Sequence, residues 1–521
     1  MSSPASKTRH STLEYLGVVV LATVAPTLFV LSQNWYAIHM QKSLWLIGAA
    51  LLAGISMGVL LELIVRTADF ALGRTRLSAL SSKSGLRDTL FALAAAGIPS
   101  LLLFRSLEAA LPSRAMLAAL YGAMAIAIVL LFRRVTPRPF LTFFAIFSAV
   151  SAANWLASVA TAGPPKADTL AQDFETAVFK SKPNIYLFIY DAYGSKDVYE
   201  RIFSLDNSAQ YAALQARGFK VLHSFSNYDS TWQTTLATFL GAHHYYRFEF
   251  GNADTHVGRP MMAGRTHNPV FITLQRNGYR LQQIHSLDYF VNERGNQEFI
   301  YPDEASSSAL RIFNIPFLNK LGGRKRRMTV EAQSEVLDAR IRVASEKSSG
   351  PWFTFSHVNL PAHSPGLPWL QLKGFEKDFR ERTARANEHM LATIDRIKAL
   401  DPTAVIAIFG DHGAMRYHQI WGAGDPNQAF AEAGFTPEIV TLDRFGIMIA
   451  IYSAGLCDDQ VYQGLTPVNI MRTIFACLAD DRRIASRHAD DISLFGGKKG
   501  RLRLTAENGR ILPQWQVYEP K

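Results

Sequence analysis

The chain has 521 residues, of which 48% are hydrophobic and only 19% are charged, and its formal net charge is +11. This length favours two or three folded units over one ordinary domain. The positive charge is uneven, because residues 1–165 hold 13 Lys and Arg against 5 Asp and Glu, whereas the rest hold 41 against 38. A nucleic-acid-binding domain would concentrate basic residues in its folded part, so this balance argues against nucleic acid as a partner.

Five long apolar runs occupy the N-terminal third, each near the ~20 residues that a helix needs to cross a bilayer. We place them at about 14–32, 44–65, 88–104, 115–132 and 139–160. Basic residues cluster before the first run, between the second and third, and between the fourth and fifth. Because positive loops stay in the cytoplasm, the N-terminus is expected inside and everything after residue 160 outside. A cleaved signal peptide is the alternative for the first run, but no small-residue cleavage site follows it.

The remaining chain predicts a linker followed by an α/β domain. Residues 161–183 contain Gly163, Pro164 and Pro165 and are interpreted as the linker between a transmembrane domain over 1–160 and an exported domain over 184–521. Short apolar strands then alternate with helical stretches, which predicts a mostly parallel sheet with helices on both faces. A long helix is expected at about 373–399, and strands are expected at 184–191, 219–225, 279–286, 352–360, 404–411 and 445–452.

The two cysteines, Cys457 and Cys477, both lie in the exported part. An oxidising compartment permits a disulfide between them, and two buried free thiols are an equal alternative. The absence of a CxxC pattern argues against a zinc ribbon or a thiol redox function.

Three of the expected strands carry side chains suited to a metal ion. The first ends on Asp191, another ends on Asp411 and His412, and a third contains His357 with His363 shortly after it. Ligands of open α/β sheets bind beyond the carboxyl ends of the strands, so these residues are expected to converge. Two carboxylates and an imidazole suit zinc or manganese, with magnesium as a further choice.

The stretch NYDSTWQTTLATFLGA, residues 227–242, is crowded with hydroxyl groups at the start and in the first turns of an expected helix at about 232–240. The simple interpretation is a helix N-cap, in which a Ser or Thr side chain binds an unpaired backbone N–H. The alternative is a nucleophile, because a hydroxyl beside a metal ion loses its proton readily and a helix N-terminus attracts anions. The hydroxyl residues are Ser230, Thr231, Thr234, Thr235 and Thr238.

The motifs IYDAYG, NYDSTWQTTLATFLG, FSHVNLPAHSP and AVIAIFGDHG occur in this order. Together with the five expected spans, they resemble the alkaline phosphatase superfamily, in its sulfatase-like branch of membrane phosphotransferases. That branch includes lipid A phosphoethanolamine transferases and lipoteichoic acid synthases. The resemblance covers nearly the whole chain. It implies a five-helix transmembrane bundle in a bacterial inner membrane and a periplasmic sulfatase-like catalytic domain.

The resemblance also implies roles for single residues. The family's nucleophile is a Thr followed three residues later by Ser or Thr, which matches Thr231 with Thr234. His363, in the sequence AHSP, matches a His that contacts the substrate phosphate or protonates a leaving group. The implied metal ligands are Asp191, Thr231, Asp411 and His412. Substrate binding is assigned to Thr234, His357, His418 and Arg416.

The implied reaction moves phosphoethanolamine or phosphoglycerol from a phospholipid donor to an extracytoplasmic glycan or glycolipid through a phospho-threonine. The alternative is a phosphodiesterase or phosphatase that uses the same metal site with water. Two departures from the family pattern bear on the transferred group: Asp191 stands where those transferases usually have Glu, and their disulfide framework is missing. The formylglycine cysteine of sulfatases is also absent, because Thr231 occupies its position, which disfavours a true sulfatase. A non-catalytic scaffold would predict a broken site, whereas every expected ligand position is filled.

Overall fold

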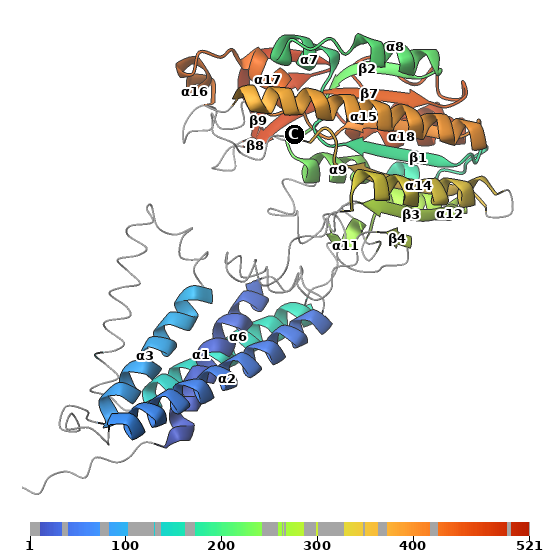
Figure 1. The fold of residues 1–521 in the computed structure, drawn as a ribbon. Coiled ribbons are helices and arrows are strands. Elements are labelled where there is room, and N and C mark those ends of the chain that lie inside the picture. The colour runs from blue at the N-terminus through green and yellow to red at the C-terminus, as the bar shows by residue number, and fades with distance from the viewer. Residues whose placement is uncertain are drawn as a thin grey trace, which may run out of the picture. The chain divides into compact units, whose positions relative to one another are not determined.

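A computed structural model describes most of the chain as two compact units, the N-terminal helices and the part from residue 172 onward (Figure 1). Each unit is described by itself below. The described residues are 11–33, 40–72, 83–102, 130, 137–161, 172–241, 259–262, 264, 267–285, 298–300, 328–346, 350–362, 372–416, 426–496 and 502–519.

The N-terminal unit contains α1 (Thr12–Gln33), α2 (Met40–Leu72), α3 (Lys83–Leu102) and α6 (Pro137–Thr161). Within the described residues, three segments of these helices are long and apolar enough to cross a membrane. Those segments are Thr12–Ser32, Ser43–Ala68 and Pro137–Ala160, with mean hydropathies of 2.1, 2.2 and 1.7.

Five spans are therefore not shown. Helix α3 covers the expected third run, but its first turns carry Lys83, Arg87 and Asp88, and it is not among the membrane-length apolar helices. The expected fourth run, at about 115–132, lies outside the described residues apart from Leu130.

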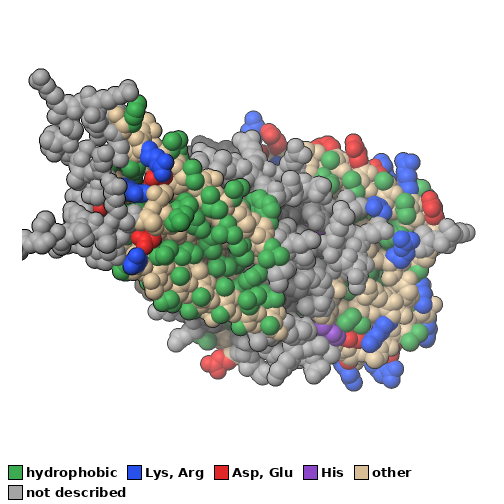
Figure 2. All heavy atoms as spheres, turned by 90° about the horizontal axis from the view of Figure 1, so that it is seen from below, with side chains coloured by type: hydrophobic (Ala, Val, Ile, Leu, Met, Phe, Trp, Pro, Cys, Tyr) green, Lys and Arg blue, Asp and Glu red, His purple; other side chains and the backbone are tan. Residues whose placement is uncertain are grey.

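Helix α1 is the central helix of this unit, because its apolar segment is 72% buried whereas those of α2 and α6 are 22% and 17% buried. The close approach of α2 depends on two glycines. A Cβ added to Gly54 would lie 2.8 Å from the Cα atom of Val20, and one added to Gly58 would lie 2.3 Å from Leu16 Cδ1. Such small residues let membrane helices pack closely. Hydrophobic side chains cover much of the face of this unit that is seen in Figure 2, and large exposed ones include Leu52, Leu63 and Phe143.

Polar contacts join one end of the helices. The Arg87 guanidinium donates to Thr12 Oγ1 and to the Glu62 carboxylate, both at 2.7 Å. Arg138 Nε donates to Glu14 Oε1 at 2.9 Å. These contacts place the first turns of α1 and α6 at the same end, so the chain leaves α6 at the end opposite to the start of α1.

The second unit is built on a seven-stranded sheet in the order β2-β7-β6-β1-β5-β3-β4. All neighbours pair in parallel except β7, which runs antiparallel to both β6 and β2. The prediction of a mostly parallel sheet is confirmed, and each of the six expected strands is present. The strands are β1 (Ile185–Tyr190), β2 (Lys220–Phe225), β3 (Arg280–His285), β4 (Glu298–Ile300), β5 (Trp352–Val358), β6 (Val405–Gly410) and β7 (Gly446–Tyr452).

Helices cover both faces of this sheet (Figure 1). Successive side chains of a strand point to opposite faces, so the residues of β1 contribute alternately to two hydrophobic cores. Ile185, Leu187 and Ile189 enter one core, whereas Tyr186, Phe188 and Tyr190 enter the other. The first core is covered by α9 (Thr231–Leu240), α12 (Pro269–Arg276) and α18 (Pro467–Ala479). The second is covered by α7 (Lys196–Phe203), α8 (Ser208–Ala216), α14 (Val330–Ser345), α15 (Leu372–Leu400) and α17 (Pro437–Phe445).

Several elements had not been anticipated from the sequence. A second, antiparallel sheet of β8 (Ile492–Gly496), β9 (Leu502–Glu507) and β10 (Arg510–Tyr518) follows α18. In β10 only Trp515 is buried, so this strand lacks the alternation of polar and apolar residues that marks a strand in sequence. The short helices are η3 (Asp173–Thr176), α11 (Arg259–Met262), α16 (Pro426–Glu432) and α19 (Arg482–Ala485).

The segment 172–180, within the region interpreted as a linker, packs on the α/β unit. Phe174 and Phe179 both contact the ring of Phe475 in α18. Asn277 accepts a hydrogen bond from the Phe179 N–H and donates one to the Ala177 carbonyl, at 2.8 and 2.9 Å. The fixed part of the α/β unit therefore begins no later than residue 172.

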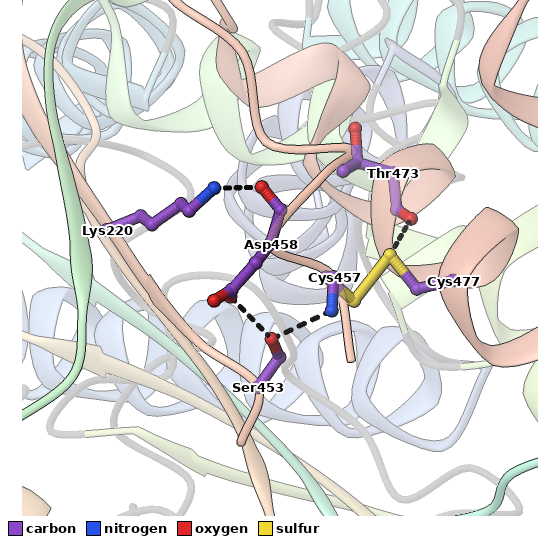
Figure 3. Close-up of a disulfide and its surroundings, with 6 residues drawn as sticks. All are labelled: Lys220, Ser453, Cys457, Asp458, Thr473 and Cys477. Carbon is purple, nitrogen blue, oxygen red and sulfur yellow. Dashed lines mark hydrogen bonds between the residues drawn. A yellow bond between two sulfur atoms is a disulfide. The ribbon is translucent and has the colours of Figure 1, made fainter. Parts of the chain in front are cut away.

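The two cysteines form a disulfide, which decides between the two alternatives (Figure 3). It joins Cys457, in the turns after β7, to Cys477 in α18, with Cα atoms 5.3 Å apart. Ser453 Oγ accepts a hydrogen bond from the Cys457 N–H at 2.9 Å, and Lys220 contacts the carbonyl of Asp458 in the same turns. Because β7 begins beside the candidate site described below and runs away from it, the disulfide lies at the far end of that strand.

Candidate metal centre and active site

The carboxyl ends of two neighbouring parallel strands bring the expected ligands together. Tyr190 at the end of β1 pairs with Gly410 at the end of β6, so the next residues, Asp191 and Asp411, leave the sheet side by side. One ligand atom from each of Asp191, Asp411 and His412 lies within 4.8 Å of the others. All three side chains are buried. The predicted convergence of these residues is therefore present in the structure.

The glycines on either side of Asp411 and His412 are required by close packing of the backbone. A Cβ on Gly410 would lie 2.2 Å from the carbonyl oxygen of Tyr193, and one on Gly413 would lie 2.2 Å from that of Asp443. Real Cβ contacts are not that short, so any larger residue would displace the turn. The motif GDHG thus specifies the path of the chain as well as two candidate ligands.

His412 is held in one orientation. Its Nδ1 lies 2.8 Å from the Gly413 carbonyl oxygen, and because a carbonyl only accepts, Nδ1 carries the proton. The other ring nitrogen, Nε2, therefore faces the acidic side chains, 3.5 Å from Asp411 Oδ2 and 3.7 Å from Asp191 Oδ1. Burial opposes a charged imidazole, but the carboxylates of Asp411 and Asp191 outweigh it and raise the pKa of His412. The field at Nε2 favours a cation.

Asp411 has one oxygen engaged and one available. Its Oδ1 accepts hydrogen bonds from the backbone N–H groups of Ala192 and His412, both at 2.9 Å. Its Oδ2 is buried and has no hydrogen-bond partner in the part of the chain that the structure describes. Burial alone would raise the pKa of this carboxyl, but His412 and His357 nearby bring it below the usual range. A buried carboxylate oxygen beside an imidazole nitrogen and a second carboxylate fits a divalent metal ion.

Thr231 joins this cluster from the N-terminus of α9. It is the first residue of the helix, and its Oγ1 lies 3.3 Å from His412 Nε2. Ser230 is the N-cap residue, with extended backbone angles, but its side chain makes no capping hydrogen bond. The N-cap interpretation is therefore wrong for the Ser230 side chain, although the helix does begin at this point. The helix N-terminus, with its partial positive charge, adjoins the candidate metal ligands.

Other predicted site residues lie at different distances from this centre. His357 in β5 places Nε2 3.7 Å from Asp411 Oδ2, beside the cluster. Thr234 is fully buried, and its hydroxyl donates to the Tyr228 carbonyl at 3.0 Å. The Arg416 guanidinium donates to the Ile202 carbonyl at 2.6 Å and to the Glu376 carboxylate. Thr234 and Arg416 thus bind other parts of the chain. These contacts do not support the expected role of either residue in substrate binding.

Two predicted residues cannot be placed. His363, expected to contact the phosphate, and His418, expected to bind substrate, both lie outside the described residues. Their assignments stay predictions. The structure does show that Ala362, the residue before His363, has a positive φ of 63° and donates its N–H to the Asp191 carbonyl at 2.8 Å. The chain is therefore anchored at the site directly before His363.

An ion pair beside the cluster had not been predicted. Arg444 Nη1 donates to Asp229 Oδ2 at 2.5 Å, and Arg444 is buried. Asp229 precedes Thr231 by two residues and contributes to the raised pKa of His412. Nothing in the local pattern connects positions 215 residues apart.

Neither a protein-family model nor a curated protein sequence matches this chain. Solved structures do resemble it. The C-terminal periplasmic domain of EptC from Escherichia coli, in complex with zinc, matches with a TM-score of 0.39 and 12% identity, over 58% of this chain and 85% of that one. The lipoteichoic acid synthase LtaP from Listeria monocytogenes matches with a TM-score of 0.37 and 12% identity, over 66% and 92%.

The periplasmic domain of the phosphoethanolamine transferase EptC from Campylobacter jejuni matches with a TM-score of 0.33 and 9% identity, over 56% of this chain and 89% of that one. At these identities the likeness is one of fold alone. These solved structures are what the chain resembles in fold.

Proposed function

We propose that this protein is a metal-dependent membrane phosphotransferase whose nucleophile is Thr231. The observation that carries the proposal is the placement of the Thr231 hydroxyl, 3.3 Å from His412 Nε2 and at the N-terminus of α9. A hydroxyl in that position meets the two requirements of the reaction. It lies beside groups that fit a cation, and the phosphate that it would attack meets a helix N-terminus.

Asp191, Asp411 and His412 would hold the metal ion, with Thr231 as a further ligand. Zinc or manganese suits this donor set best, and magnesium is a further choice. When bound, the ion would supply positive charge that favours the deprotonated hydroxyl and balances charge on the phosphate oxygens. The protein's own contribution is to fix the hydroxyl, to keep the imidazole nitrogen aimed inward through Gly413, and to exclude water by burial.

The proposed reaction has two steps. Thr231 Oγ attacks the phosphorus of a phospholipid headgroup, a bond forms between them, and the ester bond to diacylglycerol breaks. The proton that Thr231 loses is balanced by the proton that the departing diacylglycerol oxygen takes up, for which His363 is the proposed donor. The hydroxyl of a glycan or glycolipid then attacks the phospho-threonine, loses its proton, and returns a protonated Thr231.

The membrane-length helices of the N-terminal unit are consistent with a phospholipid as the donor. Three described helices are long and apolar enough to cross a bilayer, and α1 and α6 start at the same end of that unit. We propose that the N-terminus is cytoplasmic, that five helices span a bacterial inner membrane, and that the α/β unit is periplasmic. The proposed transferred groups are phosphoethanolamine and phosphoglycerol.

The test is to detect the covalent intermediate in the full-length protein. The protein in detergent is mixed with phosphatidylethanolamine or phosphatidylglycerol, quenched and digested with trypsin, which releases residues 221–247 as one peptide containing Thr231. We expect an added mass on Thr231 that identifies the transferred group. Thr231→Ala should abolish the adduct, and Thr231→Ser, which keeps a hydroxyl, should retain it.

Two results would count against this proposal. Wild-type turnover of lipid by Thr231→Ala would show that another nucleophile acts. Release of the headgroup as a free phosphate ester at the same rate with and without an acceptor glycan would show that water is the natural acceptor. The protein would then be a phosphodiesterase that uses the same residues.

A further inference from the structure

Three consecutive residues, Asp443, Arg444 and Phe445, lie where α17 ends and β7 begins, and they contact the loop that precedes Thr231. The Phe445 carbonyl accepts a hydrogen bond from the Ser226 N–H at 2.7 Å. Arg444 Nη1 donates to Asp229 Oδ2 at 2.5 Å. Both ends of the loop 226–229 are therefore attached to this junction, with Thr231 two residues beyond the second attachment.

The same junction also holds the loop that carries Asp411 and His412. The Arg444 carbonyl accepts from the Gly413 N–H at 2.8 Å, and the Asp443 carbonyl accepts from the Met415 N–H at 3.1 Å. Asp443 Oδ1 accepts from the Arg416 N–H at 2.9 Å. One short segment thus fixes the candidate nucleophile on one side and the candidate metal ligands on the other.

The ion pair of Asp229 and Arg444 is buried and has no net charge, and both properties bear on its role. The side chains of Arg444 and Asp229 are 5% and 15% exposed, so both groups are largely removed from water. Buried ion pairs seldom stabilise a fold better than apolar residues of the same size, so the hypothesis for this pair is that it fixes one arrangement. The pair is also neutral as a whole, so Asp229 can hold the loop without repelling an anionic substrate.

We propose that Asp229 and Arg444 are positioning residues that hold the Thr231 hydroxyl over the metal ligands. This inference rests on the proposed function only for the identity of the nucleophile. Asp229 anchors the loop, Arg444 anchors Asp229, and the Arg444 backbone anchors Gly413. The distance between hydroxyl and ligands is thereby set by one rigid connection. The adjacent carboxylate also makes Arg444 necessary, because an unpaired Asp229 would oppose the approach of a phosphate.

The experiment uses the full-length protein and two measurements. The first is the rate at which the adduct on Thr231 forms with phosphatidylethanolamine or phosphatidylglycerol. The second is the visible spectrum of the protein loaded with Co²⁺, which depends on the number and arrangement of the ligands and requires no substrate. The variants are Asp229→Asn, Arg444→Met and the double variant. Glu438→Gln is the control, because Glu438 lies in α17 and forms an exposed ion pair with Arg201.

We expect Asp229→Asn to bind Co²⁺ in the wild-type amount and to change its spectrum in the same direction as Thr231→Ala. Adduct formation should fall about 10- to 100-fold, the usual effect of removing a group that orients a metal-site residue. The adduct on Thr231 should form more slowly in Arg444→Met than in the double variant, because the double variant also lacks the Asp229 carboxylate that Arg444→Met leaves unpaired. Glu438→Gln should match the wild type in both measurements, since exposed ion pairs contribute little.

Two outcomes would overturn the inference, and a third would overturn its electrostatic part. A wild-type spectrum and rate in Asp229→Asn would show that the pair does not position Thr231. Loss of Co²⁺ from that variant would show that the pair supports the metal ligands instead. A double variant no faster than Arg444→Met would remove the electrostatic argument. If the wild type itself forms no adduct, the proposed function fails, and the Co²⁺ spectra still decide whether the pair positions Thr231.

Discussion

Replacing Gly413 by Ala tests whether the packing behind His412 determines metal binding. The added Cβ would lie 2.2 Å from the Asp443 carbonyl oxygen, 2.7 Å from its carbonyl carbon and 3.0 Å from the Arg444 carbonyl carbon. All three atoms belong to the backbone of a buried segment, so no side chain can rotate away. Ordinary contact begins at 3.4 Å, so the two segments must separate by roughly 1.2 Å along the shortest contact.

That displacement has two consequences. The hydrogen bonds from the Gly413 and Met415 N–H groups to this segment are lost, at about 1 kcal/mol each. Overpacking adds about 1–3 kcal/mol, so the free energy of unfolding should fall by about 3–5 kcal/mol. Metal sites tolerate ligand displacements of about 0.2 Å, so a shift of roughly 1 Å next to His412 should weaken metal binding by about 100-fold or more.

The assay is calorimetric titration of the metal-free protein with Zn²⁺ and Mn²⁺, with thermal unfolding measured on the same samples. Gly97→Ala is the matched control, because a Cβ there meets no atom of the described residues within 4 Å. It should bind metal like the wild type and change the free energy of unfolding by no more than about 1 kcal/mol. Wild-type metal affinity in Gly413→Ala would refute the argument that this contact holds the ligands in place.

Further predictions concern the metal, the disulfide and the membrane helices. Chelation should lower the unfolding temperature of the wild type but not of Asp411→Asn, since a ligand at 100 times its Kd stabilises a protein by about 2.7 kcal/mol; equal shifts in both proteins would contradict the site. Cys477→Ser should destabilise the α/β unit by about 3 kcal/mol, as expected for a bond between residues 20 positions apart, and a reducing agent should do the same to the wild type only. Metal affinity should be unchanged, because the bond lies at the far end of β7. Gly58→Leu should separate α1 from α2 and lower the thermal stability of the detergent-solubilised protein, whereas Gly48→Leu, at a position with nothing within 4 Å, should not; equal effects would show that close packing at Gly58 is unimportant.

The parts of this protein that its sequence predicts are those in which the signal is local. The buried strands β1, β6 and β7 are nearly continuous apolar runs, so their positions follow from composition alone. Asp191, Asp411 and His412 come directly after such runs, and the geometry of parallel strands brings them to one edge. Thr231 was identified by its motif, and the structure places it against His412.

Other features depend on contacts between residues far apart in the chain, and no local pattern encodes them. The ion pair of Asp229 and Arg444 and the disulfide exist because folding brings separate segments together. The absence of a capping bond from Ser230, among the described residues, was also not readable from the sequence. The amino-acid sequence by itself predicted six strands of the larger sheet, the apolar character of the N-terminal helices and the residue types of the candidate site. Only the tertiary structure placed the Thr231 hydroxyl beside His412 and Asp229 against Arg444, because packing alone brings the junction at 443–445 against both loops.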